Sequence, residues 1–150
     1  MRAPDDDDGD FAVHRARRAA ATAQIAARTE IDAALIETLV RGFYARVAQD
    51  SMLGPIFAAR IGDWEPHLAQ MMRFWSSVAL STGVYQGRPM EKHLSLPITQ
   101  AHFDHWLVVF EETARALCPP AAATHFIARA HTIAQSLAAG VARAHAAAAL

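Results

Sequence analysis

The sequence predicts an all-α protein with one hydrophobic core. Apolar residues recur at helical spacing in four segments, whereas strand-forming residues never gather into alternating runs. Glycine and proline fall in a few clusters between these segments, as is typical of turns and helix ends. A chain of 150 residues is long enough for one core but short for two, and 53% hydrophobic residues favour a globular domain.

The first 28 residues are predicted to form a tail, and residues 29–150 the domain. The tail opens with the acidic run 5–8 and continues as an alanine- and arginine-rich segment without a regular apolar stripe. A segment that buries so little apolar surface is expected to be solvated, and either flexible or loosely helical.

The first helix of the domain is expected to begin near Thr29. Thr29 and Asp32 have the spacing of a capping box, which satisfies free amides at a helix start. Gly54 and Pro55 end the periodic pattern, and a short turn carrying Ile56 follows. Residues on the apolar face recur every four positions: Ile31, Leu35, Leu39, Phe43 and Val47.

Three more helices are expected. The second is capped by Asp63, tolerates Pro66 in its first turn and ends near Gly83. The third spans about 99–117, where two prolines stop it, and the last runs from about residue 121 into the 140s and frays at its end.

Residues 83–97 are predicted to be a loop with at most one or two helical turns. Two glycines and two prolines in this stretch exclude a long helix. The loop carries His93, and because its neighbours Leu94 and Leu96 are apolar, the imidazole ring can face an apolar cavity.

Composition excludes several classes of protein. A net charge of −1 gives no basic stripe for nucleic acid, and the single cysteine, Cys118, can form neither an internal disulfide nor a cysteine-based metal site. The acidic start is unlike a signal peptide, and no stretch has the length of a membrane span. We therefore expect a cytoplasmic protein that binds neither membrane nor nucleic acid.

The familiar motifs of helical enzymes are also missing from the sequence. There is no phosphate-binding glycine loop, no His-Glu-x-x-His zinc motif, no Glu-x-x-His di-iron motif and no Gly-x-Ser-x-Gly nucleophile elbow. The remaining candidates are histidines and aromatics on apolar faces. These candidates are His93, His67 with Met71 one turn further, Tyr44 and Trp106.

Each candidate also has an ordinary structural interpretation. A histidine near apolar residues is often a partly buried side chain bonded to the backbone, and Tyr44 and Trp106 can be core residues with satisfied polar tips. His102 and His105 share a helical face and could hold a metal, although no third ligand is evident. Spacing alone leaves the function open.

The sequence resembles the group III truncated haemoglobins over about 120 residues, from near Ile31 to the last helix. No single segment is specific, but the ordered set is. The matching segments are FYARV (43–47), LGPIF (53–57), WEPHL (64–68), FWSSV (74–78), TG (82–83), YQGRPM (85–90), HL (93–94), LP (96–97), HF (102–103) and WL (106–107).

The resemblance implies a two-over-two helical sandwich around haem b, with the proximal segment reduced mostly to loop. His93 matches the family's proximal iron ligand, and Phe57 matches a phenylalanine that packs on the porphyrin. Met71 lies at an apolar distal position. Tyr44, His67 and Trp106 match the distal tyrosine, histidine and tryptophan. We expect Phe43, Leu94 and Leu96 to contact the haem as well.

The implied function is reversible binding of dioxygen, or of CO or NO, at a penta-coordinate iron. Tyr44 and Trp106 would donate hydrogen bonds to the ligand, and His67 would bind the ligand or gate its entry. Two alternatives stay open: a haem enzyme for peroxide or nitric oxide chemistry supplied by an external reductase, and a haem-free interaction or metal module using His102 and His105. A monomer or a weak homodimer is expected.

Overall fold

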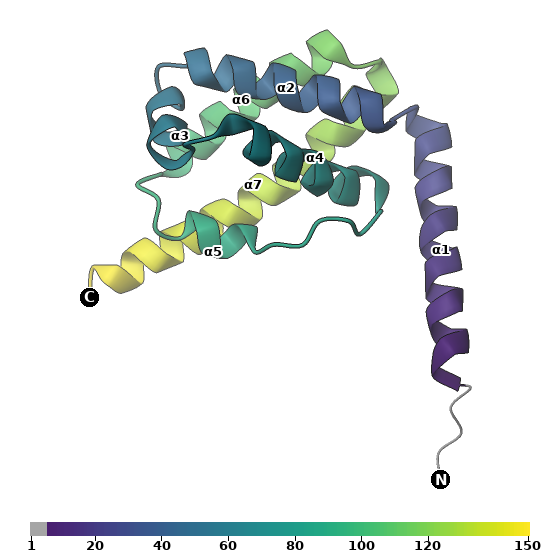
Figure 1. Ribbon diagram of the computed structural model, residues 1–150. Helices are drawn as coiled ribbons and strands as arrows, with labels where there is room; N and C mark the ends of the chain where they lie inside the picture. The colour runs from purple at the N-terminus through teal and green to yellow at the C-terminus, as the bar shows by residue number, and fades with distance from the viewer. Residues whose placement is uncertain (1–5) are drawn as a thin grey trace.

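The structure is a computed structural model, and it describes residues 6–150. This part of the chain is helical and contains no strand, so the all-α prediction is confirmed (Figure 1). The helices are α1 (Asp6–Thr29), α2 (Ala33–Gln49), α3 (Gly54–Arg60), α4 (Trp64–Leu80), α5 (Pro89–His93), α6 (Gln100–Leu117) and α7 (Pro120–Ala148).

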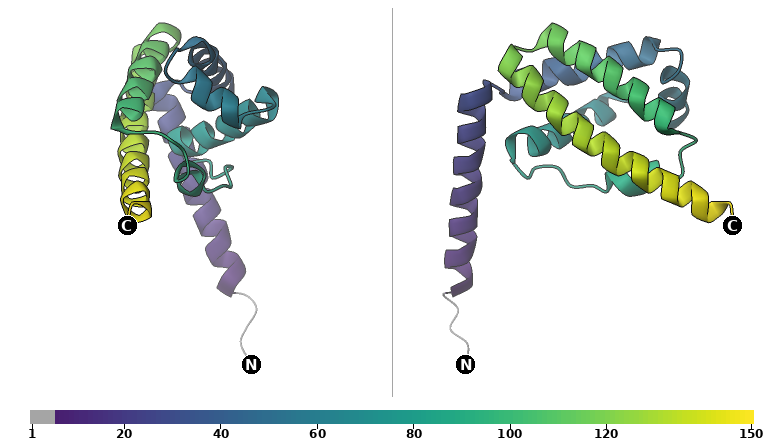
Figure 2. Two further views of the ribbon diagram at one scale, coloured as in Figure 1. Left: turned by 90° about the vertical axis from the view of Figure 1, so that its left-hand side faces the viewer. Right: turned by 180° about the vertical axis from the view of Figure 1, so that it is seen from behind.

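The four longest helices of the domain form two layers. Helices α2 and α4 make one layer, and α6 and α7 make the other, as the left view of Figure 2 shows end-on. Helix α2 contacts both α4 and α6, and α4 also contacts α7. The expected two-over-two sandwich is therefore confirmed. Helix α5 and the segment before it run beneath α4 and against α7.

Aromatic side chains join the two layers. The ring of Phe110 stacks between Trp75, at 4.9 Å, and Trp106, at 5.4 Å. Phe43 from α2 meets Phe110 edge-on at 5.4 Å. Phe43 and Phe110 are fully buried, which places the α2 stripe predicted from sequence at the centre of the core. The stacked rings fix the distance between the layers.

The helix ends agree with the sequence in most places. Asp63 caps α4, with its Oδ1 accepting from the Glu65 amide at 3.3 Å, and Pro66 lies in the first turn. Ser81, in the left-handed region at φ 58°, ends α4 two residues before the expected Gly83. The predicted short turn at Ile56 is the seven-residue helix α3. Helix α5, with five residues, confirms the mostly loop-like segment 83–97.

The capping box predicted at Thr29 and Asp32 is wrong. Asp32 is itself the N-cap of α2, and its Oδ1 accepts from the Leu35 amide at 2.8 Å. Thr29 instead closes α1, where its hydroxyl donates to the Ile25 carbonyl at 2.7 Å. Glu30, at φ 62°, reverses the chain between the two helices. Thr29 is the last residue of α1, so it is not available as a cap of α2.

Helix α1 projects from the two-layer body (Figures 1 and 2). Only its C-terminal half packs, where the Thr22 hydroxyl donates to the Leu80 carbonyl at 2.6 Å and Ile25 contacts the core. Nearer the N-terminus, Phe11 is 67% exposed. The segment expected to be a tail is therefore a largely exposed helix, and the run 5–8 begins outside the described residues. Among the described residues, none of the helices has the length and hydropathy required for a transmembrane span.

Candidate functional site

A cavity of about 370 Å³ lies between the two layers and above α5. This volume falls within the range of small-molecule sites. The lining is mostly apolar, with polar groups at a few points. The lining residues that the sequence singled out are Tyr44, Phe57, His67, Met71, His93, Leu96, His102 and Trp106. They come from five different segments of the chain, so the fold brings the candidates together.

His93 lines this cavity with one ring nitrogen engaged by the backbone. It is the last residue of α5, and its Nδ1 lies 2.6 Å from the Pro89 carbonyl oxygen, one helical turn earlier. A carbonyl oxygen can only accept, so Nδ1 carries the proton in the neutral ring. The lone pair is then on Nε2. A backbone carbonyl on one nitrogen and a free lone pair on the other is the arrangement found in metal-ligating histidines.

His67 is the unsatisfied polar group of the site. Its Nε2 is buried and has no hydrogen-bond partner in the described part of the chain. Desolvation and the nearby charge of Lys92 lower the pKa of His67, so the ring is neutral at physiological pH. A buried nitrogen without a partner costs about 1–3 kcal/mol. The cavity therefore contains a group that is suited to an external hydrogen-bonding ligand.

Tyr44 and Trp106 add two potential donors. The Tyr44 ring meets the His67 ring edge-on at 5.0 Å and the Phe57 ring at 5.8 Å. Burial raises the pKa of Tyr44, so its hydroxyl stays protonated. Trp106 is held by its stacking on Phe110 and by an edge contact with Phe43 at 5.5 Å. Both side chains are fixed by packing rather than by their polar atoms.

Two predicted contact residues are placed elsewhere. Phe43 is 1% exposed and lies in the core layer behind Tyr44 and Trp106, outside the cavity lining. Leu94, immediately after α5, is half-buried and also lies outside the lining. Neither residue lines the cavity, although Phe43 packs against Tyr44 and Trp106, which do.

Sequence reasoning missed two basic residues of the site, Arg60 and Lys92. Both are exposed, and Arg60 donates to the Ser95 hydroxyl at 3.0 Å, which links α3 to the loop after α5. A signal was present, because Lys92 precedes His93 and Arg60 follows Phe57 by three residues on the same helix. Apolar lining residues from the second layer were also missed: Phe103, Ile133, Ala134 and Leu137.

His102 and His105 have hydrogen-bond partners within the chain, and His102 also lines the cavity. His102 Nδ1 accepts from the Thr99 amide at 3.0 Å, within the first turn of α6. His105 Nε2 lies 2.6 Å from Asp50 Oδ2, and this bond lowers the pKa of Asp50. No cluster of three or more potential metal-ligating side chains occurs within residues 6–150. The fold thus gives these histidines other partners than a shared metal.

Comparison with known proteins yields a consistent set of similarities. A model of the family described as "Bacterial-like globin" matches residues 31–138. The chain is 42% identical over 83 residues to the group 3 truncated hemoglobin ctb of Campylobacter jejuni, covering 52% of this chain and 65% of that protein. It is 37% identical over 70 residues to the group 1 truncated hemoglobin GlbN of a Nostoc species, covering 46% of this chain and 58% of that protein.

The three-dimensional likeness extends further than these sequence matches. The crystal structure of the group III truncated hemoglobin from Campylobacter jejuni superposes with a TM-score of 0.70 at 34% identity. The superposition covers 74% of this chain and 91% of that one. Residues 31–138, which the family model matches, include helices of both layers and every residue that lines the cavity.

Proposed function

This chain belongs to the bacterial-like globin family, and from that membership we propose that it is a haem b protein that reversibly binds dioxygen or another diatomic gas, CO or NO. The observation that carries the proposal is His93. Its Nδ1 is bonded to a backbone carbonyl, and its Nε2 lone pair is therefore available in an apolar cavity.

The residues of the cavity fit a haem group. Apolar side chains from α3, α4, α6 and α7 suit the faces of a porphyrin. Arg60 and Lys92 among the lining residues suit the two carboxylates on a porphyrin edge. The unpartnered Nε2 of His67 suits a polar ligand on the iron. Thus the charged, polar and apolar groups all match the chemistry of the cofactor.

We assign His93 as the proximal ligand. When bound, haem supplies an iron atom whose sixth coordination position binds small gases. The Pro89 carbonyl orients the His93 ring and increases the basicity of Nε2 by accepting the Nδ1 proton. Phe57 and Leu96, which line the cavity, contribute apolar surface for the macrocycle and exclude water.

We assign Tyr44, Trp106 and His67 to ligand stabilisation. Tyr44 O–H and Trp106 N–H would donate to a diatomic ligand that carries partial negative charge, and His67 would offer its unpartnered ring nitrogen. A hydrogen bond to a charged group contributes about 1.5–3 kcal/mol in a site that excludes water. Met71 contributes apolar surface on the same helix as His67. These hydrogen bonds would therefore stabilise bound dioxygen more than bound CO, which carries less charge.

Absorption spectroscopy of the full chain tests the proposal. We expect haemin to bind with a 1:1 end point and to produce a Soret band. After reduction with dithionite, CO should shift this band. Haemin that produces only the spectrum of free haemin at every ratio would overturn the proposal. The variant Arg60→Glu/Lys92→Glu should weaken haemin binding, whereas Arg17→Glu/Arg129→Glu, at exposed positions of α1 and α7, is the charge-matched control.

Peroxide or nitric oxide chemistry is a second candidate, and one observation favours it. The His67 ring is neutral and its Nε2 has no partner in the described part of the chain, so in the tautomer with the proton on Nδ1 this nitrogen could take a proton from hydrogen peroxide. The two electrons that reduce peroxide to water would come from an external reductase. Multiple turnovers of peroxide with a chemical reductant would support this activity. The variant His67→Leu should lose these turnovers but still bind CO. Strictly stoichiometric reaction would exclude it.

A further inference from the structure

We propose that the end of α7, residues 139–148, is a seat for α5 that sets the position of His93, and that Gly140 is its key positioning residue. This segment lies beyond residue 138, where the family match ends. The proposal rests on the assigned role of His93, but its structural part can be measured without haem.

Gly140 forms a notch in α7 that the Met90 side chain occupies. Gly140 is buried within the helix, and a Cβ added there would overlap Met90 Sδ and lie 2.8 Å from Met90 Cε. Glycine inside a helix costs about 1 kcal/mol relative to alanine. Since any side chain would displace Met90, the glycine allows α5 to approach α7 closely.

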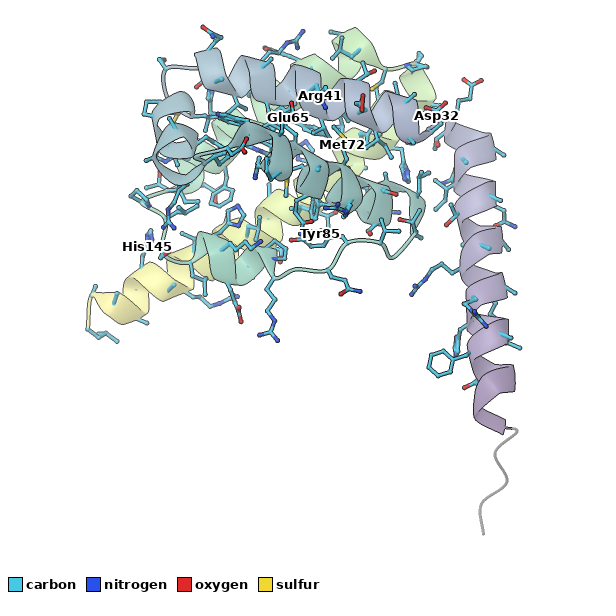
Figure 3. All side chains as sticks on the ribbon, in the orientation of Figure 1. Asp32, Arg41, Glu65, Met72, Tyr85 and His145 are labelled. Carbon is cyan, nitrogen blue, oxygen red and sulfur yellow. The ribbon has the colours of Figure 1, made fainter. Side chains whose placement is uncertain are left out.

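Two further contacts continue the seat along α7. His145 Nε2 lies 3.1 Å from the Leu96 carbonyl oxygen, in the loop that follows α5, and Figure 3 shows His145 beside that loop. Val141 is buried in a cluster with Ile98 and Phe103 at the beginning of α6. Residues 140–145 therefore contact α5, the loop after it and the start of the next helix.

Helix α5 needs such support because it is too short to be stable alone. It has five residues, and its flanking backbone hydrogen bonds are long, at 3.3 Å from the Lys92 amide to the Arg88 carbonyl and 3.2 Å from the Leu94 amide to the Met90 carbonyl. Its position must come from tertiary contacts, and its contacts with other helices are with α7.

The seat acts on His93 through neighbouring atoms. Met90 directly follows Pro89, whose carbonyl accepts the His93 Nδ1 proton. The overlap is with the outer atoms of a flexible side chain, so a small residue at position 140 can be accommodated. We expect a side chain as large as leucine to shift the Met90 backbone as well, and with it the neighbouring carbonyl that orients the imidazole ring. The expected consequence is a changed direction of Nε2 toward the cavity, and hence a changed iron–histidine bond.

A charge-neutral set of variants tests the proposal. Gly140→Leu fills the notch, and Gly9→Leu adds the same side chain in α1, where nothing lies within 4 Å of the added Cβ. The double variant Gly140→Leu/Met90→Ala restores space for the larger residue. Because leucine favours helix over glycine, α7 itself should form in each variant.

The first readout is amide hydrogen exchange of the haem-free chain. We expect the Lys92 and Leu94 amides to exchange about tenfold faster in Gly140→Leu than in Gly9→Leu, because local opening of α5 becomes easier. The double variant should recover most of the protection. Equal exchange rates in Gly140→Leu and Gly9→Leu would contradict the proposal that residues 139–148 hold α5 in place.

The second readout is the iron–histidine stretching band of the reduced, haem-loaded chain, recorded by resonance Raman spectroscopy. We expect this band to shift or broaden in Gly140→Leu, to stay in place in Gly9→Leu and to return in the double variant. Faster exchange with an unchanged band would overturn the proposed effect on His93. Failure of the unsubstituted chain to bind haem would overturn the proposed function instead. The exchange measurement on the haem-free chain would still show whether the end of α7 holds α5 in place.

Discussion

Two histidines line one cavity in opposite hydrogen-bonding states. His93 has one nitrogen engaged by the Pro89 carbonyl, whereas His67 Nε2 has no partner among the described residues. The two histidines also differ in their place in the fold. His93 is the last residue of the short helix α5, whereas His67 lies within the long helix α4. The first state suits iron ligation and the second suits contact with an external ligand.

Replacing Tyr44 by phenylalanine should accelerate dioxygen release. The variant Tyr44→Phe keeps the ring, which packs against Phe57 and His67, and removes only the hydroxyl donor. Loss of one charge-assisted hydrogen bond is worth about 1.4 kcal/mol or more, which corresponds to roughly tenfold faster dissociation. Stopped-flow displacement of dioxygen measures this rate. Release of CO from the same protein is the control and should change much less. Equal effects on both gases would contradict a donor role.

The lowered pKa of His67 predicts a loss of stability on acidification. In the unfolded chain the ring titrates near its ordinary value of about 6.5, while in the folded chain it resists protonation because of desolvation and Lys92. Between the two pKa values the unfolded state binds more protons, so the free energy of unfolding falls as pH falls below about 6.5. Urea denaturation of the haem-free chain at pH 7.5 and 5.5 should show this fall. It should be smaller in His67→Gln, and an equal fall in both chains would contradict the assignment.

Individual residues were predicted from sequence to different degrees. The resemblance identified Tyr44, His67, His93 and Trp106, and the structure places all four on one cavity. Arg60 was missed because a basic residue on an exposed helical face normally indicates only solvation. Its relation to the site depends on how α3 packs, and spacing along the chain does not encode that.

At the scale of elements, local signals predicted most helix boundaries of the domain to within a few residues. Asp63, Pro66 and the paired prolines at 119–120 mark real boundaries, because each acts on the adjacent backbone alone. The boundary near Thr29 was misplaced because a second helix, α1, ends there. A capping signal shows that a helix begins nearby but does not exclude a different helix that ends at the same residues.

Asp50 should be the most sensitive connection between elements outside the site. Its Oδ1 accepts from the Met52 and Leu53 amides, both at 2.9 Å, and its Oδ2 meets His105 Nε2. These bonds tie the turn between α2 and α3 to α6. Asp50→Ala should lower the free energy of unfolding of the haem-free chain by about 1–3 kcal/mol, since two amides and one imidazole lose their partner.

Chemical denaturation compares Asp50→Ala with a matched control. Asp104→Ala removes an exposed carboxylate that accepts only from Gln100 on the same helix, at 2.9 Å. Such a surface substitution should change the free energy of unfolding by less than about 0.5 kcal/mol. Equal effects of the two substitutions would contradict a linking role for Asp50.

For the whole molecule, the two layers leave an apolar cavity of about 370 Å³ near the centre of the domain. Filling it should stabilise the fold, because only the folded chain assembles the lining from its separate segments. Haemin in free excess at about 1,000 times its dissociation constant would add about 4 kcal/mol to the free energy of unfolding. Denaturation with and without haemin measures this gain, and identical transitions would show that haemin does not select the folded state.

The architecture was predictable at two levels of detail. Periodicity predicted four helices, because burying an apolar stripe constrains residue spacing. The glycines and prolines of residues 83–97 predicted a mostly irregular segment that carries His93. The crossing of the layers came from the family resemblance, since spacing does not specify which helical faces meet. Neither source predicted the contact between Met90 and Gly140, which joins residues 50 positions apart and requires the close approach of α5 to α7.

The central claim is that His93 Nε2 holds the iron, and ligand replacement tests it most directly. In His93→Gly, loaded with haem, the iron–histidine stretching band should disappear, and added imidazole should restore a five-coordinate imidazole-bound spectrum in the vacated space. His14→Gly, which removes an exposed histidine from α1, should keep the original band. Persistence of the original iron–histidine band in His93→Gly would show that another residue is the ligand and would contradict the assignment.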